Sequence, residues 1–418
     1  MKLFKFFFFL IGLIRGLIKG WKYPKSDQSI VSFLNEPSFG HKITGLDYLA
    51  RLFPREKIIL YVLVNSKINK YLFDLYREYI SVIFIYPYSA KSNFFRICTP
   101  AEALGIKKGI QLAFIIRSVE FFIPHPVTLY RAMNIDHEKM SVYKFSDNKI
   151  KAPYETFYSH SFLLEHVKLN SVGLRKDDLN SGHLAVQKVI PNASDKLVSF
   201  IFRNDGNKHI TFHDKIRDSG PVKNYQEAIK YLSSKGYTIL LFGDLDFSEF
   251  HKIKNVVEAA ILDCDQDLLN IFSLTSSNFI VTQHSGPIHL ANITSVPAVI
   301  TDFLPLWQGS CGNKDIFVPK NFYVRDGMRK IPLRTIFSKY SDLFFGAYDK
   351  HPEVEVGPSL PEDITAAVIE MESQFDPNSK YEPDYKLLEN YRRMIPAKSI
   401  HAYRKNRISN QLLKKEFS

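Results

Sequence analysis

The sequence predicts an α/β protein in which two doubly wound parallel sheets follow one another along the chain. Short apolar runs alternate with amphipathic stretches from Ser29 onward, and the same alternation restarts near Pro191. A chain of 418 residues also exceeds one ordinary domain of about 100–200 residues. With 45% hydrophobic and 23% charged residues, the composition is that of a globular protein and excludes wholesale disorder. We expect a helix over 1–25, domains over 29–185 and 191–350, and a C-terminal helix with a basic tail over 351–418.

The first domain begins with three apolar runs that predict buried strands, at 29–34, 57–64 and 81–86. A loop over 35–41 follows the first run. Apolar residues then recur at helical spacing until Pro54, and a second helix is expected over 71–79. This order of elements is the opening of a parallel sheet. Residues 100–180 indicate mainly helices and loops.

The second domain repeats the pattern after a boundary near 180–195. Strands are expected at 197–202, 237–242, 260–262, 278–282 and 298–301, and helices begin near Tyr225, Asp267 and His289. Gly236 is typical of a helix C-terminus. The segment Ser359-Leu360-Pro361-Glu362 has the form of a capping box and predicts a last helix, beyond which the chain becomes polar and basic.

The first 25 residues have the pattern of a helix lying in the plane of a membrane. The uncharged run Phe6–Ile14 is too short for a membrane span of about 20 residues, and no A-x-A-type cleavage site follows it. On a helical wheel, one side is apolar and carries Trp21 at its end, while most basic residues fall opposite. A tilted or re-entrant insertion, an uncleaved signal anchor and a helix docked on its own domain are the alternatives.

The distribution of charge argues against nucleic-acid binding. The net charge is +12, of which residues 1–25 carry +6 and residues 381–418 carry +5, so the body between them is close to neutral. A nucleic-acid binder carries its basic footprint on the folded domain, whereas basic termini favour an anionic membrane surface. Three widely separated cysteines, Cys98, Cys264 and Cys311, favour neither a disulfide scaffold nor a zinc site and fit a reducing compartment.

Two loops follow predicted strands at the carboxyl edge of a sheet, where open α/β folds bind ligands. The first contains Gly40 and His41. Glycine permits a tight turn, and an imidazole at the start of a helix is suited to general base catalysis near neutral pH. A surface or capping histidine is the alternative.

The second loop contains His284-Ser285-Gly286 and leads into a helix with His289. A small, glycine-containing turn before a helix is typical of a phosphate site, although a plain strand-to-helix turn has the same pattern. Arg203 and Arg217 follow the first strand of this domain and are candidates for a diphosphate, unless they only pair with Asp205 and Asp218. Neither a GxGxxG nor a GxxxxGK[ST] motif is present, which argues against a classical dehydrogenase or P-loop NTPase.

Several of these motifs resemble a known family. SFGHKITGLDYLARLFPREKI is similar to the N-terminal loop, helix and strand of lipopolysaccharide heptosyltransferase-like glycosyltransferases, and VTQHSGPIHLANITSVPAVI resembles their donor site. FRND (202–205) and IRDSGPVKNYQEAIKYLSSKGYTILLFGD (216–244), followed by DQDLLNIF (265–272), resemble bacterial glycosyltransferases of GT-B architecture. The resemblance covers about 30–55 and 197–310, and it extends to the helix Pro361–Met371.

This resemblance implies a GT-B fold, with two Rossmann-like domains facing a cleft, and sugar transfer from a nucleotide sugar without a cofactor or a metal. The family carries Gly-Asp where this chain has Gly40-His41, so the resemblance implies that His41 is the base. Its acidic residue before Ser/Thr-Gly is replaced by His284. The donor is expected at Gly40, Arg203, Asp205, Arg217, Gly243, His284, Ser285, Gly286 and His289.

We therefore expect an inverting glycosyltransferase that acts on a cell-surface glycan or lipid-linked acceptor. The place of action would be the cytoplasmic face of a bacterial inner membrane, with the protein attached peripherally. Two alternatives remain. A nucleotide-sugar epimerase of the same architecture would need no acceptor, and a non-catalytic membrane-attached interaction module would bind without turnover.

Overall fold

The structure is a computed structural model, and it describes the chain in segments. These are residues 2–21, 29–34, 39–52, 57–63, 69–85, 141–145, 148–152, 164, 167–193, 196–203, 219–304, 312–325, 329–340, 343, 350–376, 379, 382–395 and 406–417. They fall into two compact units, Met1–Gly173 and Leu174–Ser418. The predicted cleft between the two units stays a prediction.

The N-terminal helix, α1 (Lys2–Trp21), lies within the predicted 1–25, of which residues 1 and 22–25 fall outside the described residues. Its apolar residues Phe7, Leu10, Ile14 and Ile18 recur at helical spacing and are 38–58% exposed. Within the described part of the chain, no helix is both long and apolar enough to cross a membrane.

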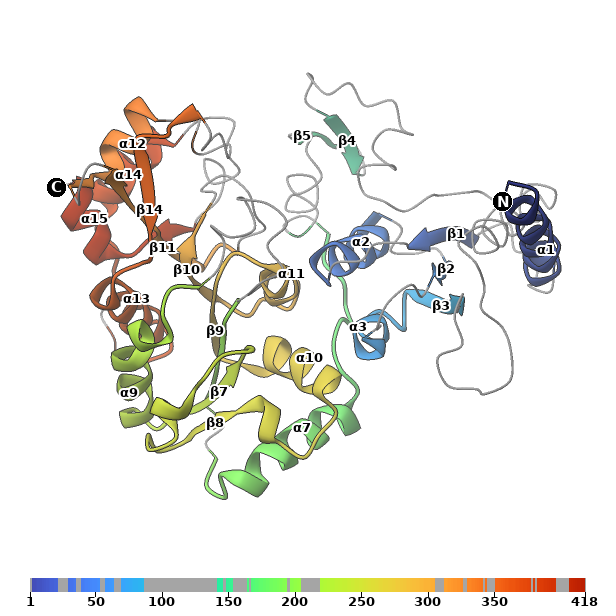
Figure 1. The fold of residues 1–418 in the computed structure, drawn as a ribbon, viewed down its shortest axis with the longest axis horizontal. Helices are drawn as coiled ribbons and strands as arrows, with labels where there is room; N and C mark the ends of the chain where they lie inside the picture. Colours follow the sequence, from blue (N-terminus) through green and yellow to red (C-terminus); the bar gives the residue numbers. More distant parts are fainter. Residues whose placement is uncertain are drawn as a thin grey trace. The chain divides into compact units, whose positions relative to one another are not determined.

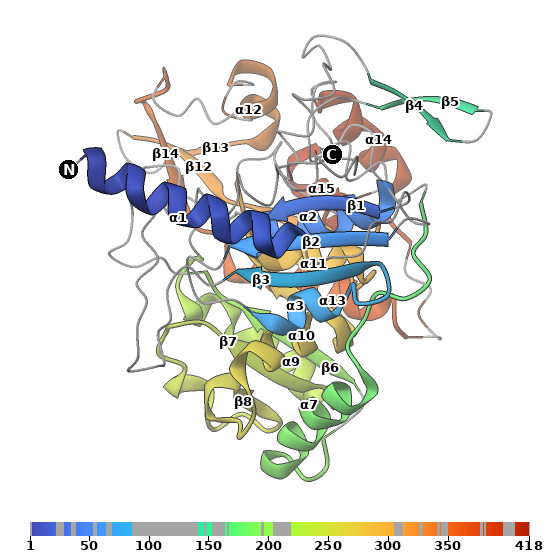
Figure 2. The same ribbon diagram turned by 90° about the vertical axis from the view of Figure 1, so that its right-hand side faces the viewer.

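A three-stranded parallel sheet forms the centre of the first unit (Figure 2). Its strands lie in sequence order as β1 (Ser29–Leu34), β2 (Lys57–Leu63) and β3 (Ile80–Ile85), close to the predicted bounds. The helices that connect them are α2 (Phe39–Leu52) and the short α3 (Lys70–Asp74). The structure corrects the predicted loop over 35–41, because Phe39, Gly40 and His41 already belong to α2. A hairpin of β4 (Ser141–Phe145) and β5 (Asn148–Ala152) also lies in this unit.

A buried polar cluster fixes α2 within the first unit. Asp47, fully buried, accepts hydrogen bonds from Arg51 Nε at 2.6 Å and from the Tyr76 hydroxyl at 2.9 Å. Arg51 also donates to the carbonyl of Val167. Burial and the neighbouring Asp47 carboxylate raise the pKa of Tyr76 well above its ordinary value, so the hydroxyl stays protonated and donates. The cluster joins α2, the turn after α3 and the segment that leads to the second unit.

The second unit is built on a seven-stranded sheet with the order β15-β11-β10-β9-β6-β7-β8 (Figure 1). All its strand pairs are parallel. The strands are β6 (Leu197–Ile201), β7 (Thr238–Phe242), β8 (Val256–Glu258), β9 (Phe279–Thr282), β10 (Ala298–Phe303), β11 (Ile316–Pro319) and β15 (Arg407–Ile408). The α/β class is confirmed, while the strand predicted at 260–262 lies earlier, because Ala259–Ile261 form a 3₁₀ turn, η4.

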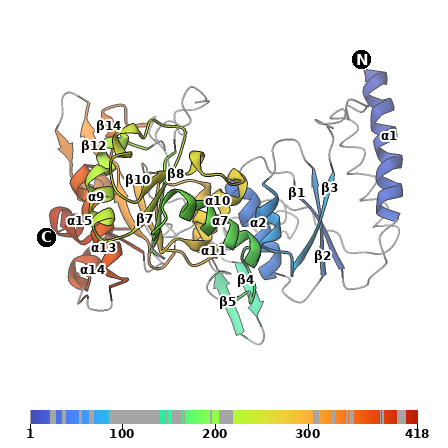
Figure 3. The same cartoon turned by 90° about the horizontal axis from the view of Figure 1, so that it is seen from below.

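Helices cover both faces of this sheet (Figure 3). On one face lie α9 (Gln226–Ser234), preceded by the 3₁₀ turn η2 (Val222–Tyr225), and α13 (Pro361–Ser373). On the other lie α7 (Lys176–Val189), α10 (Gln266–Ser276) and α11 (Gly286–Ile293). A 3₁₀ turn, η3 (Ser248–Phe250), follows β7.

The boundary between the units lies at Gly173/Leu174, before the predicted 180–195. The boundary lies earlier because α7 packs on the second unit. The predicted first domain, 29–185, had included most of this helix. The α-carbon of Gly182 lies so close to the Phe272 ring of α10 that a β-carbon would come within 2.5 Å of it. His183 packs edge-on against the same ring. Helix α7 therefore belongs to the second unit.

The C-terminal segment is part of the folded second unit, which corrects the expectation of a separate basic tail. Strand β15 pairs with β11, and α14 (Tyr385–Met394) and α15 (Asn410–Phe417) pack together. Basic residues of this segment pair with acids, as Lys415 does with Asp363 and Arg407 with Glu370.

An antiparallel sheet that was not predicted lies between β11 and α13 along the chain. It consists of β12 (Asn321–Val324), β13 (Lys330–Ile331) and β14 (Val354–Gly357), with α12 (Leu333–Lys339) following β13. The predicted capping box before α13 is not formed, because Leu360 is the N-cap. The Ser359 hydroxyl instead donates to the carbonyls of Val318 and Pro319.

Candidate functional site

The strand order of the second unit defines a topological switch point between β6 and β9. From β6 the chain adds β7 and β8 on one side, and it then returns to place β9 on the other side of β6. The chain therefore continues from β6 to β7 on one side and from β9 to β10 on the other, and the carboxyl ends of two such strands are where doubly wound sheets bind ligands. The loops after β6 and β9 both contain residues predicted from the sequence.

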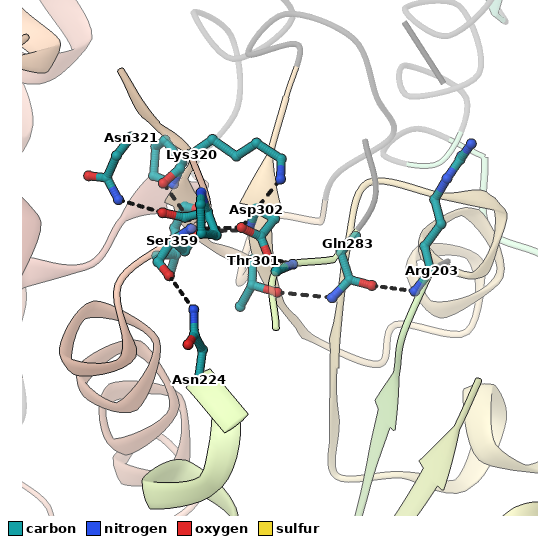
Figure 4. Close-up of polar contacts among 12 residues, drawn as sticks. Arg203, Asn224, Gln283, Thr301, Asp302, Lys320, Asn321 and Ser359 are labelled. Atoms are coloured by element: carbon teal, nitrogen blue, oxygen red, sulfur yellow. Dashed lines mark hydrogen bonds and ion pairs between the residues drawn. The ribbon is translucent and has the colours of Figure 1, made fainter. Parts of the chain in front are cut away.

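Arg203 lies at this edge, two residues after the end of β6. Its backbone N–H donates to Gln283 Oε1 at 2.6 Å, and its carbonyl accepts from the N–H of Ser219 at 2.9 Å. In Figure 4 the Arg203 side chain continues beyond the end of the strand, away from Gln283. The guanidinium is thus held at the switch point by backbone contacts on both sides of its residue.

Gln283, the first residue after β9, is fully buried and connects β6 with β10. Its Nε2 donates to the Tyr225 hydroxyl at 3.1 Å and to Thr301 Oγ1 at 3.3 Å. The Gln283 oxygen accepts from the Arg203 N–H, so both the oxygen and the NH₂ group of this amide are hydrogen-bonded (Figure 4). The Gln283 side chain therefore positions the Arg203 backbone.

Asp302, in β10, is the charged centre of the same network. It is 1% exposed, and its carboxylate accepts from the N–H groups of Gly220 and Ser359, each at 2.7 Å. The Tyr225 hydroxyl donates to it at 3.0 Å, and Lys320 Nζ lies 3.6 Å away. Burial, together with the Asp302 charge, raises the pKa of Tyr225 well above its ordinary value, so this tyrosine remains a donor.

The turn after β9 leads into a helix N-terminus, a position that favours anions. Ser285 is the N-cap of α11 with an extended backbone, and Gly286 and Pro287 begin the helix. All residues of this turn are among those that the structure describes, and the Ser285 side chain makes no capping hydrogen bond to the first turn of α11. The hydroxyl and the positive end of the helix dipole lie next to the Arg203 strand end, where they favour a phosphate.

The two histidines of this motif are buried and have different surroundings. His284 is 7% exposed, and its ring packs edge-on against Phe303 with centroids 5.5 Å apart. His289 is 8% exposed and lies one turn inside α11, away from the helix start. The structure therefore places His284 at the switch point and His289 in the body of the helix.

Gly243 is required for packing at the end of β7. Its φ of +146° favours glycine, and a β-carbon there would lie 3.1 Å from the backbone oxygen and the β-carbon of Phe202. Gly243 thus allows the β7 end to approach the β6 end at the edge that carries Arg203.

Of the remaining predicted residues, two lie outside the described residues and two belong to the first unit. Asp205 and Arg217 lie outside the described residues. Gly40 and His41 are the second and third residues of α2 in the first unit, where Gly40 is buried.

Five side chains of the network were not predicted as site residues from the sequence: Tyr225, Gln283, Thr301, Asp302 and Lys320. Tyr225 has the spacing of a core helix residue, which it also is, since it is fully buried. Asp302 stands inside the apolar run Ala298–Leu304, and a lone acid in a buried parallel strand is the signal that points to it. Lys320 carries no comparable signal.

Among the described residues, no three His, Cys, Asp or Glu side chains gather as a metal site requires. The expectation of metal-independent transfer stays a prediction.

No protein-family model and no curated protein sequence matches this chain. Solved structures do match. A family 9 glycosyl transferase from Veillonella parvula DSM 2008 is 14% identical, with 71% of this chain and 87% of that chain covered and a TM-score of 0.41. For the ADP-heptose lipopolysaccharide heptosyltransferase II of E. coli, the identity is 13%, the coverage 77% and 99%, and the TM-score 0.40.

A third match is E. coli heptosyltransferase WaaC, solved with ADP-2-deoxy-2-fluoro heptose. It is 12% identical, covers 69% of this chain and 92% of that chain, and has a TM-score of 0.38. These structures fall in the class of glycosyltransferases that the sequence motifs resemble. At such identities and TM-scores, the activity of this chain has to be argued from its own residues.

Proposed function

We propose that this protein is a glycosyltransferase that moves a sugar from a nucleotide-sugar donor to a cell-surface glycan or lipid-linked acceptor, with inversion at the anomeric carbon. The observation that carries the proposal is the switch point between β6 and β9. There Arg203 and the Ser285-Gly286 helix start lie at one edge of a doubly wound sheet. An arginine beside a helix N-terminus suits a diphosphate, which is the leaving group of a nucleotide sugar.

In the proposed reaction the acceptor hydroxyl attacks the anomeric carbon and displaces the nucleoside diphosphate. His41 takes the hydroxyl proton as the bond to the sugar forms. Negative charge grows on the departing diphosphate, and Arg203, Arg217 and the first turn of α11 stabilise it. No cofactor and no metal takes part in this proposal.

The test is the release of nucleoside diphosphate from a panel of nucleotide sugars, with and without glycan and lipid-linked acceptors. We expect release from one donor that depends on an acceptor and continues in the presence of a chelator. Conversion of the donor without an acceptor would indicate the epimerase, and binding without turnover would indicate a non-catalytic module.

Arg203→Ala should weaken the affinity for the donor by about 10- to 100-fold, because hydrogen bonds to charged groups contribute about 1.5–3 kcal/mol. The KM for the donor and the Kd for the nucleoside diphosphate should rise together. Arg325→Ala, in a turn after β12, is the control for loss of a positive charge. An unchanged KM in Arg203→Ala would remove Arg203 from the donor site.

We also propose that α1 attaches the protein peripherally to the cytoplasmic face of the inner membrane, close to a lipid-linked acceptor. The exposed apolar residues Phe7, Leu10, Ile14 and Ile18 support this, as do the six basic residues in the first 25. Each Lys or Arg near an anionic surface contributes about 1 kcal/mol, so the charges matter as much as the apolar side. Because the C-terminal segment is folded into the second unit, α1 is the attachment that we propose.

Deleting residues 1–22 should leave a folded protein that loses most of its binding to anionic liposomes, since the first sheet strand begins at Ser29. Co-sedimentation with vesicles measures this, and added salt should weaken binding of the full chain. Ile14→Glu with Ile18→Glu is the point-variant counterpart, and Ser181→Glu, exposed on α7, is its control. Attachment that resists salt and alkaline extraction would contradict the in-plane helix.

A further inference from the structure

Asp302 occupies a backbone conformation that its surroundings must maintain. Its φ is +49°, in the left-handed region that residues with a β-carbon rarely adopt, although aspartate does so more readily than most. It lies within the buried strand β10, and it is 1% exposed. Such a conformation persists only where neighbouring contacts fix it.

Each carboxylate oxygen of Asp302 accepts a backbone N–H, and each also lies near one polar side chain. Oδ1 receives the N–H of Ser359 at 2.7 Å and lies 3.6 Å from Lys320 Nζ. Oδ2 receives the N–H of Gly220 at 2.7 Å and the Tyr225 hydroxyl at 3.0 Å. The side chain thereby ties β10 to the segment before α9 and to the segment before α13.

Two hydrogen-bonded paths lead from this carboxylate to the two peptide groups of Arg203. The first runs from Asp302 through the Tyr225 hydroxyl and the Gln283 amide to the Arg203 N–H. The second runs through Gly220 to its neighbour Ser219, whose N–H donates to the Arg203 carbonyl. Asp302 is therefore connected to Arg203 on both sides without touching its guanidinium (Figure 4).

We propose that Asp302 is a positioning residue that holds Arg203 for binding of the donor diphosphate, an inference that rests on the proposed function. Its negative charge is essential to this role. In asparagine, whichever way the amide is turned, the NH₂ group faces the N–H of either Ser359 or Gly220, so one contact becomes a clash between two donors.

Asp302→Asn is the test, and Asp315→Asn is a closely matched control. Asp315 is also 1% exposed, and its two oxygens accept the N–H groups of Ala298 at 2.9 Å and Gly312 at 2.5 Å. It precedes β11 and bonds to the first residue of β10, at the opposite edge of the sheet from Arg203. Both variants remove one buried charge that binds two backbone amides, so both should lower the melting temperature.

Amide hydrogen exchange in the ligand-free protein measures directly whether the Arg203 backbone is held in place. In Asp302→Asn, exchange of the Arg203 and Ser219 amides should accelerate about 10-fold or more, although neither amide bonds to Asp302. In Asp315→Asn these two amides should exchange as in the wild type. Equal acceleration in both variants, or none in Asp302→Asn, would overturn the proposal.

Binding of ADP, GDP, UDP and CDP, measured by calorimetry, provides the second arm. The nucleotide that binds the wild type should bind Asp302→Asn about 10-fold more weakly and Asp315→Asn with unchanged affinity. Unchanged affinity in Asp302→Asn would overturn the link to donor binding. If the wild type bound none of the four, the proposed function would fail, while the exchange arm would still decide whether Asp302 positions Arg203.

Tyr225→Phe serves if Asp302→Asn does not fold. It keeps the buried ring and removes only the hydroxyl that joins Asp302 to Gln283. Exchange should then accelerate at the Arg203 amide and stay unchanged at the Ser219 amide, because the second path is intact. Acceleration at both amides, or at neither, would contradict the two separate paths.

Discussion

Replacing Glu370 by alanine should destabilise the second unit by about 3–5 kcal/mol, the usual cost of leaving a buried charge without its partner. Glu370 is 5% exposed on α13. Its Oε1 pairs with Arg407 of β15, and its Oε2 accepts the N–H of Asn410, the first residue of α15, at 2.7 Å. Burial lowers the pKa of Arg407 to about 10, which reflects the cost of holding its charge inside the protein. Since domains are stable by only about 5–15 kcal/mol, a large fall in melting temperature should follow.

The matched control is Glu389→Ala on α14. Glu389 pairs with Arg393 at 2.6 Å, but both side chains are more than 60% exposed, so this loss should cost less than about 1 kcal/mol. The double variant Glu370→Ala with Arg407→Met should recover much of the lost stability, because it removes the unpaired charge. Denaturant unfolding of the three variants decides the matter. Equal stability of Glu370→Ala and Glu389→Ala would show that the buried pair does not hold the C-terminal segment.

Replacing His41 by alanine should lower kcat by about 10²- to 10⁴-fold, the usual contribution of a general base. The KM for the donor should change little, because the base acts on the acceptor hydroxyl and Arg203 binds the diphosphate. Arg203→Ala, in contrast, should raise the KM for the donor. Initial rates with the donor and acceptor found in the panel measure both constants.

Two controls separate loss of the base from loss of structure in the His41 variant. His183→Ala removes an exposed histidine on α7, in the second unit, and should leave kcat unchanged. Added imidazole should restore part of the rate of His41→Ala and should not affect the wild type. If His41→Ala kept the full rate, His41 would not be the general base. The Gly40-His41 motif would then serve only as the start of α2.

The three strands of the first sheet, and β6, β7, β9 and β10 of the second, were predictable because each is a short apolar run bounded by polar residues, whereas β11 and β15 were not predicted. Strand β7 (Thr238–Phe242) is buried at every position, as expected for a parallel strand covered on both faces, so its apolar composition alone marks it. Gly236 ends α9 with a φ of +81°, as its place in the sequence indicated. The weaker predictions concerned ends of elements, as at α2, where Phe39–His41 are helical despite the Pro-Ser-Phe-Gly context.

Strands at the sheet edge and side chains that bond across the fold were beyond sequence reasoning. Strand β15 has two residues and no apolar run, and only its pairing with β11 makes it a strand. Ser359 has the spacing of a capping residue, but the approach of β10 and β11 gives its hydroxyl and N–H other partners. Local pattern contains no information about such contacts.

The sequence by itself determined the α/β class, the strands around the switch point and the candidates Arg203, Ser285 and Gly286. Periodicity and turn chemistry act locally, so they can be recognised without the fold. Only the tertiary structure decided that Asp302, 99 residues after Arg203, is connected to both of its peptide groups. It also decided that α7 and the basic C-terminal segment belong to the second unit. The physical reason is that buried hydrogen bonds and ion pairs join residues by their distance in space, which the order of strands in the sheet sets and the order of residues along the chain does not.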